Sequence, residues 1–104
     1  MEISITQADP SQLKPKPKDE SNLGFGDIPT DHMFLINFES EKGWINPRIE
    51  PYANISIDPA AMGIHYGQEI FEGLKAYCGT DGDISLFRAR DNFERFNRSA
   101  RRMC

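Results

Sequence analysis

The hydrophobic positions of this chain gather in short runs that predict β-strands. Met33–Phe38 is nearly continuously apolar and rich in strand-forming residues, so we expect a well-buried strand there. Ile70–Tyr77 predicts a second strong strand. Two shorter runs, Trp44–Ile49 and Ala53–Ile57, predict short extended pieces. They are separated by Pro47 and Pro51, which favour sheet edges or bends.

The last third of the chain predicts a hairpin followed by a helix. Asp81-Gly82 is a turn signal, and Ile84–Phe87 is expected to return antiparallel to the preceding strand. A helix is predicted over Asp91–Met103, with the Asp91 carboxylate as its N-cap and Glu94 completing a capping box. Its buried stripe is expected to contain Phe93, Phe96, Ala100 and Met103.

Together these elements predict an α+β fold, a mostly antiparallel β-sheet with one or two packed helices. A length of 104 residues allows one small domain. We expect residues 1–22 to form a flexible arm, because Lys14-Pro15-Lys16-Pro17-Lys18 alternates charge with proline. Residues 23–104 then form the folded domain, which begins with a turn that presents Phe25 between two glycines.

Charge is divided unevenly along the chain, whose net charge is −4. Residues 88–104 hold six arginines and only two acidic residues, whereas acidic residues dominate before them. A basic end of this kind can bind phosphate, nucleic acid or an acidic surface, or it can be a solvated helix face. The negative overall charge makes a nucleic-acid partner the least favoured of these, so we expect none.

The cysteines and the chain ends narrow the protein class further. Cys78 and Cys104 form no metal-binding spacing and no disulfide framework, which predicts reduced thiols, a cytoplasmic location and no metal site. There is no signal-peptide pattern and no apolar run long enough to cross a bilayer, so we expect no membrane partner. The final helix reaches Cys104 without a stop signal, which is an indication of a fragment.

Three kinds of residue are candidates for chemistry, and each also has a purely structural interpretation. Arg95 offers a planar fork of donors that suits phosphate, or it is an exposed helical arginine paired with Asp91 or Glu94. Rigid aromatic rings can enclose a branched apolar group or simply form the core. A glycine in a strand can allow close approach of a ligand, or it is a strand irregularity. The aromatic candidates are Phe25, Tyr66 and Phe71, and the glycine is Gly73.

The order of short motifs over residues 23–104 resembles the branched-chain amino-acid aminotransferases, which are pyridoxal-phosphate enzymes of fold-type IV. The motifs are Phe25-Gly26, Thr30-Asp31-His32-Met33, Gly43-Trp44, Pro47-Arg48-Ile49, His65-Tyr66, Phe71-Glu72-Gly73-Leu74-Lys75-Ala76, Leu86-Phe87-Arg88, Asn92 with Arg95, and Arg98-Ser99-Ala100. The resemblance implies the small N-terminal domain of such an enzyme, in the D-amino-acid aminotransferase-like fold. It also implies that the large domain of the enzyme lies outside this chain.

The resemblance assigns expected roles residue by residue. It implies that Arg95 contacts the phosphate of pyridoxal 5′-phosphate, and that Phe25, Tyr66, Phe71 and Gly73 line the substrate pocket. No catalytic residue is expected in this chain, because the family's Schiff-base lysine lies in the large domain and Lys75 does not match its motif. Lys75 is interpreted as a strand-face charge that pairs with Glu69 or Glu72.

The implied activity is transamination of leucine, isoleucine or valine with 2-oxoglutarate by a homo-oligomer. The 104 residues alone are expected to be inactive and to bind the cofactor weakly or not at all. Two alternatives stay open. One is a non-catalytic stand-alone or dimerisation module of the same fold. The other is a different fold-type IV enzyme, a D-amino-acid aminotransferase or an aminodeoxychorismate lyase.

Overall fold

The computed structural model describes residues 2–103 and divides them into two units. The first runs to Ile55 and the second begins at Ser56, and each is described by itself. The regular elements of the first unit are mainly strands, whereas the second contains a hairpin and two α-helices. The predicted α+β class is therefore confirmed. The predicted division of the chain at residue 22 stays a prediction.

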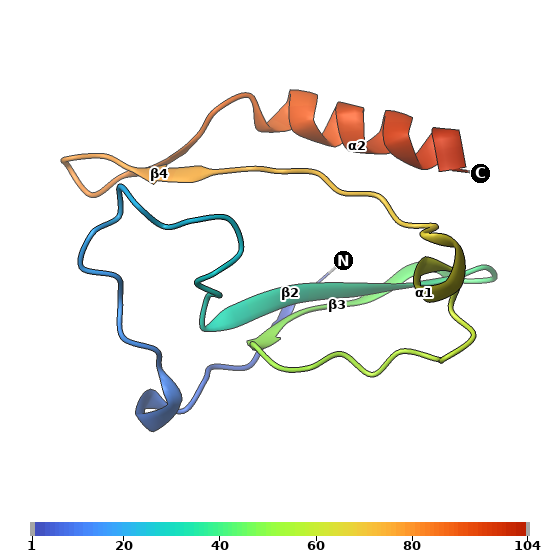
Figure 1. Cartoon of the computed structure of the whole chain (residues 1–104), viewed down its shortest axis with the longest axis horizontal. Helices are drawn as coiled ribbons and strands as arrows, with labels where there is room; N and C mark the ends of the chain where they lie inside the picture. Colours follow the sequence, from blue (N-terminus) through green and yellow to red (C-terminus); the bar gives the residue numbers. More distant parts are fainter. Residues whose placement is uncertain (1, 104) are drawn as a thin grey trace. The chain divides into compact units, whose positions relative to one another are not determined.

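The first unit is built on a three-stranded sheet in the order β1-β3-β2. β1 covers Ser4–Ile5, β2 covers His32–Glu39 and β3 covers Gly43–Pro51. β2 and β3 form a long antiparallel ribbon, which Figure 1 shows at the centre of the picture. β1 adds a short parallel pairing to β3. The predicted strand at Met33–Phe38 is confirmed, since all of it lies within β2.

The proline expected at an edge or bend, Pro47, lies instead in the middle of β3, which is the central strand of the sheet. The pairing register explains how it is accommodated. The β2–β3 ladder has an irregularity between Leu35 and Asn37, and Asn46 takes a left-handed φ of 54° at the same level. A bulge leaves one residue outside the regular ladder, so the missing N–H of proline costs no strand hydrogen bond there.

Hydrogen bonds tie part of the segment before β2 to the sheet. After β1 comes a single 3₁₀ turn, η1 (Pro10–Gln12). Asp9 caps its N-terminus, and the Asp9 carboxylate accepts a hydrogen bond of 2.8 Å from the Ser11 amide. The amide of Lys14 then donates to Asp31 Oδ1 at 2.8 Å, and its ammonium donates to the Thr30 carbonyl at 2.7 Å. These bonds tie the segment to the start of β2.

The second unit starts with a single helical turn, α1 (Met62–Tyr66), which Gly67 ends in a left-handed conformation with φ of 59°. β4 (Ala76–Cys78) and β5 (Ile84–Leu86) form an antiparallel hairpin. The hairpin turn predicted at Asp81-Gly82 is confirmed, because Gly82 has the positive φ, 86°, that the turn requires. The last helix, α2, covers Ala89–Met103.

Two boundaries in the second unit differ from expectation. The strand predicted at Ile70–Tyr77 forms only at its end, in β4, because the residues before it find no strand partner in the described part of the chain. They bond to side chains of α2 instead. The helix begins at Ala89, so Asp91 lies within its first turn and Arg88, with φ of 51°, precedes it. The N-cap prediction for Asp91 is therefore wrong, although its charge still suits a helix N-terminus.

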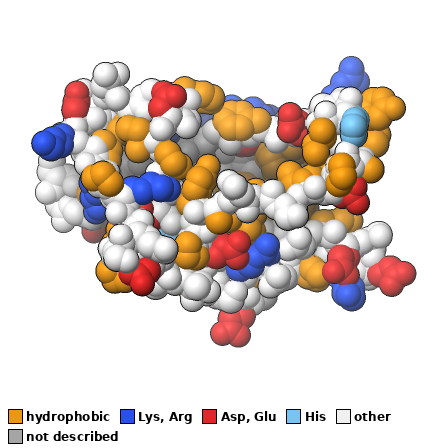
Figure 2. All heavy atoms as spheres, turned by 60° about the horizontal axis from the view of Figure 1, so that its bottom comes forward, with side chains coloured by type: hydrophobic (Ala, Val, Ile, Leu, Met, Phe, Trp, Pro, Cys, Tyr) orange, Lys and Arg blue, Asp and Glu red, His pale blue; other side chains and the backbone are white. Residues whose placement is uncertain are grey.

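Burial is the largest departure from expectation. Within residues 2–103 Pro47 is the one buried residue and no aliphatic or aromatic side chain is buried, and hydrophobic side chains are visible at the surface in Figure 2. The Met33–Phe38 strand is half-buried at best, with Phe38 61 % exposed beside Trp44, its cross-strand partner. The stripe predicted to pack under α2 is also open to solvent, with Phe93 60 % exposed. Neither unit alone provides the second apolar layer that these faces need.

Candidate functional site

The best-connected cluster of side chains in the second unit centres on Arg95 and Glu72. Arg95 Nε donates to Glu72 Oε2 at 2.7 Å, and Arg95 Nη2 donates to Glu72 Oε1. The guanidinium therefore meets the carboxylate side-on, with two hydrogen bonds to its two oxygens. The Glu72 side chain is only 11 % exposed, whereas that of Arg95 is 60 % exposed. One partner is fixed against the protein and the other reaches solvent.

Asn92 completes the cluster from one turn earlier on α2. Its Nδ2 donates to the Gly73 carbonyl at 2.7 Å and to Glu72 Oε1 at 3.1 Å. Residues three apart on a helix share a face, so Asn92 and Arg95 reach the same stretch of chain. Gln68 Nε2 also donates to the Met103 carbonyl at 3.3 Å, near the other end of α2. Figure 1 shows this stretch of chain running alongside α2.

Electrostatics keep the central pair ionised. The hydrogen bond from Arg95 lowers the pKa of the Glu72 carboxyl to about 2, and hydrogen bonds from Asn92 and the Gly73 amide lower it further against the opposing effect of desolvation. The same hydrogen bond raises the pKa of Arg95. Near neutral pH the cluster is thus a fixed ion pair with an exposed guanidinium edge.

The two acidic residues of α2 form ion pairs with other arginines, so the structural interpretation that paired Arg95 with one of them is wrong. Asp91 pairs with Arg88, and Glu94 pairs with Arg90 at 3.1 Å. Arg95 therefore pairs with neither of the helical neighbours that sequence spacing proposed. Lys75 makes no ion pair with Glu69 or Glu72 among residues 2–103, since Glu72 is occupied by Arg95.

The predicted pocket residues are partly brought together. A Cβ on Gly73 would lie 3.9 Å from the Phe71 ring, so these two are neighbours at van der Waals distance. Gly73 is joined to Arg95 through Glu72 and Asn92. Phe71 is 75 % exposed, and Tyr66, the last residue of α1, is 78 % exposed. These rings are not core residues of the unit they belong to.

Phe25 belongs to the first unit, where the turn predicted around it is confirmed. Gly24 and Gly26 have positive φ values of 68° and 78°, and the ring between them is 87 % exposed. The role of Phe25 in a substrate pocket, like the roles of Tyr66, Phe71, Gly73 and Arg95, stays a prediction.

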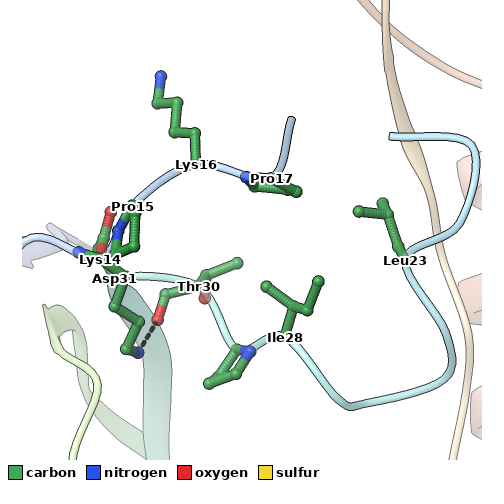
Figure 3. Close-up of a pocket in the computed structure, with 9 residues that line it drawn as sticks. Lys14, Pro15, Lys16, Pro17, Leu23, Ile28, Thr30 and Asp31 are labelled. Carbon is green, nitrogen blue, oxygen red and sulfur yellow. Dashed lines mark hydrogen bonds between the residues drawn. The ribbon is translucent and has the colours of Figure 1, made fainter. Parts of the chain in front are cut away.

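The first unit also contains a cavity of about 290 Å³. Figure 3 shows Leu23 and Ile28 on one side of it and the lysine–proline segment on the other. The bond from Lys14 to Thr30 closes one end, and the Lys14 ammonium also lies 4.4 Å from the centre of the Tyr52 ring. The cavity is mainly apolar, and none of the residues predicted to bind substrate lines it.

Glu72 and Asn92 are the functional candidates that sequence reasoning did not identify. Both occur in the motifs, but neither was assigned a part in binding the cofactor or the substrate. The usable signal was the spacing of Asn92 and Arg95, three residues apart, which places an amide and a guanidinium on one helix face. Across the described residues, no group of three His, Cys, Asp or Glu side chains is placed to hold a metal ion. The helices there are too short or too polar to span a membrane.

Comparison with known proteins matches the chain to branched-chain aminotransferases of bacteria and yeast. The chain is 53 % identical over 94 residues to the branched-chain-amino-acid aminotransferase 2 of Bacillus subtilis, covering 90 % of this chain and 26 % of that protein. It is 52 % identical over 91 residues to a probable branched-chain-amino-acid aminotransferase of Staphylococcus aureus. This match covers 88 % of this chain and 25 % of that protein. It is 44 % identical over 104 residues to the cytosolic branched-chain-amino-acid aminotransferase of Saccharomyces cerevisiae. This match covers 100 % of this chain and 28 % of that protein.

The chain thus spans about a quarter of the length of the curated relatives it matches. No protein-family model matches it.

Proposed function

Because this chain belongs to the branched-chain aminotransferase family and matches its N-terminal part, we propose that it forms the small domain of a pyridoxal-phosphate-dependent transaminase. In this role Arg95 binds the cofactor phosphate. The aromatic residues Phe25, Tyr66 and Phe71, with Gly73, line the pocket for a branched aliphatic side chain. The reactive lysine and the remaining cofactor contacts come from the rest of the enzyme.

The single observation that carries this proposal is the placement of Arg95. Its guanidinium is 60 % exposed, and its Nη1 has no protein partner among residues 2–103. An exposed guanidinium edge that is held in place and permanently charged suits a phosphate dianion. The donor set therefore fits the phosphate of pyridoxal phosphate. When bound, the cofactor supplies the carbonyl that accepts the amino group and the electron-withdrawing ring that makes its transfer possible.

The exposed aromatic rings support the second part of the proposal. A pocket for leucine, isoleucine or valine needs rigid apolar walls that exclude water, at about 0.8 kcal/mol for each buried CH₂ group. Tyr66 and Phe71 are available for such walls because they are 78 % and 75 % exposed. The lack of buried aliphatic or aromatic side chains in residues 2–103 also supports a domain whose apolar faces are covered by the remainder of a larger enzyme.

The proposed reaction moves the amino group of a branched-chain amino acid to 2-oxoglutarate, giving a branched 2-oxo acid and glutamate. This chain contributes binding and orientation, and we assign it no proton transfer. We also propose a cytoplasmic homo-oligomer for the complete enzyme. A cytosolic relative in yeast supports that location.

A chimera tests the proposal. This chain replaces the matching segment of the Bacillus subtilis branched-chain-amino-acid aminotransferase 2, to which it is 53 % identical. We expect the chimera to transaminate leucine with 2-oxoglutarate, and the 104 residues alone to show no turnover. A folded chimera without activity would contradict the proposal, and so would a chimera active only on D-amino acids. Self-association of the 104-residue chain together with a folded but inactive chimera would favour the dimerisation module.

A further inference from the structure

We propose that Glu72 and Asn92 are positioning residues, which hold the Arg95 guanidinium side-on so that its remaining edge is presented to the phosphate of the cofactor. This inference rests on the proposed function and extends it to two residues. Glu72 and Asn92 themselves do not touch the phosphate in this account. They act through Arg95.

The geometry leaves the right donors free. An arginine carries five N–H donors, and the side-on contact with Glu72 uses one on Nε and one on Nη2. The two N–H groups of Nη1 and the second of Nη2 remain. These form the end of the guanidinium, which can donate two parallel hydrogen bonds to phosphate oxygens. Glu72 therefore occupies one edge of Arg95 without blocking the other.

Fixing the side chain has an energetic consequence. A free arginine loses rotamer freedom when it binds an anion, and that loss weakens the complex. In this structure the ordering has already occurred, because Glu72 is 11 % exposed and is itself held by three groups. Those groups are Arg95, the Asn92 side chain and the Gly73 amide.

Two opposite effects of Glu72 make the proposal testable. As a counter-charge, the Glu72 carboxylate reduces the attraction between Arg95 and a phosphate. As a positioning group, it removes the ordering cost. If the counter-charge dominates, substitution of Glu72 by the neutral isostere will tighten phosphate binding. If positioning dominates, as proposed, the same substitution will weaken it.

The experiment uses the chimera described above and compares pyridoxal 5′-phosphate with pyridoxal, which lacks the phosphate. We expect Glu72→Gln to raise the Kd for pyridoxal 5′-phosphate about tenfold, which corresponds to the free-energy cost of ordering one long side chain on binding. The Kd for pyridoxal should change less than about twofold. Asn92→Ala should act in the same direction. Glu94→Gln, which breaks only the Arg90 pair on the same helix, is the matched control and should change neither value.

A double-variant cycle separates this inference from the function on which it rests. In the Arg95→Gln background, Glu72→Gln should have no further effect on the Kd for pyridoxal 5′-phosphate, because its target is gone. A tighter or unchanged Kd for Glu72→Gln alone overturns the positioning role, and so does an undiminished effect in the Arg95→Gln background. If Arg95→Gln itself leaves the preference for the phosphorylated cofactor unchanged, the proposed function fails instead.

A second measurement reports on the contact itself rather than on affinity. In the chimera, the Arg95 Nε–H proton is expected to give a sharp NMR resonance at neutral pH because it is bonded to Glu72. Glu72→Gln should broaden or remove that signal, while Glu94→Gln should leave it unchanged. An Arg95 signal that is insensitive to Glu72→Gln overturns the proposal.

Discussion

The side chain of Asn92 donates a hydrogen bond of 2.7 Å to the main-chain carbonyl of Gly73, nineteen residues earlier in the chain. The bond ties α2 to the irregular stretch that precedes β4. That stretch has no strand partner in the described residues, so side chains of α2 supply its hydrogen bonds. The Glu72–Arg95 pair lies beside this bond, because Asn92 also donates to Glu72 Oε1.

Substitution of Asn92 by alanine should release this stretch. A typical intramolecular hydrogen bond contributes about 1 kcal/mol, which corresponds to roughly a fivefold change in a local opening equilibrium. We expect the Gly73 amide to exchange with solvent at least fivefold faster in Asn92→Ala, as measured by NMR hydrogen exchange. Asn97→Ala is the control, because Asn97 is exposed on the same helix without a side-chain hydrogen bond in residues 2–103. Equal exchange rates in both variants would contradict the tethering role.

The ion pair should respond to acid at an unusually low pH. Because the pKa of Glu72 is lowered from 4.5 to about 2, the folded state binds the proton less readily than the unfolded state. Its stabilising contribution is therefore fully present above about pH 4.5 and is lost as the pH falls towards 2. A ¹³C NMR titration of the Glu72 carboxyl should show a midpoint near 2. A midpoint near the ordinary glutamate value would show that Arg95 does not hold this carboxylate.

Removal of the Asp31 carboxylate should free the segment around Lys14. Asp31 Oδ1 accepts the Lys14 amide at 2.8 Å, and no other acceptor for that amide is present in the described residues. In Asp31→Ala we expect hydrogen exchange at the Lys14 amide to accelerate about fivefold, the equivalent of roughly 1 kcal/mol. Asp27→Ala removes a nearby carboxylate that makes no such bond and should leave the rate unchanged. An equal effect of both substitutions would point to general charge rather than to this contact.

The turn of the β4–β5 hairpin should depend on Gly82. Its φ of 86° lies in the left-handed region, where an L-residue costs about 1–2 kcal/mol. Gly82→Ala should therefore open the hairpin more often and accelerate exchange of the Gly79 amide, which is bonded to the Asp83 carbonyl at 2.8 Å. Gly63→Ala is the matched control, since Gly63 lies in α1 with no positive φ and its nearest neighbour would be 3.8 Å from the new Cβ. A Gly82→Ala variant that exchanges like the wild type would contradict the strained-turn interpretation.

Sequence patterns predicted the elements that are stabilised locally. The apolar run in β2, the Asp81-Gly82 turn and the helical repeat of α2 depend on neighbouring residues, and all three form. Patterns failed where a distant partner decides the outcome. Ile70–Tyr77 has a strand-forming composition, but a strand needs a neighbouring strand to pair with. Side chains of α2, Asn92 and Arg95, bond to part of this segment instead. Spacing within α2 predicted Asp91 or Glu94 as the ion-pair partner of Arg95. The observed partner is Glu72, which lies outside the helix.

The expected burial failed for a related reason. Phe93 and Phe96 recur at helical spacing and were expected to pack, yet both remain open to solvent. Periodicity identifies the apolar face of a helix, but it does not identify what covers that face. In a chain that spans a quarter of its relatives' length, the covering surface can lie beyond the residues that carry the pattern.

The central claim, that Arg95 binds the phosphate of pyridoxal 5′-phosphate, is tested most directly by a cofactor titration of the chimera carrying Arg95→Gln or Arg98→Gln. Arg98 lies one turn further along α2 and makes no ion pair in residues 2–103, so it controls for the loss of one positive charge. We expect Arg95→Gln to raise the Kd for pyridoxal 5′-phosphate at least tenfold, because a charge-assisted, hydrogen-bonded contact with the phosphate is lost. Its Kd for pyridoxal should stay within about twofold of the parent chimera. For Arg98→Gln, the Kd values for both compounds should stay within the same range. Equal Kd values for the phosphorylated cofactor in the two variants would contradict the account.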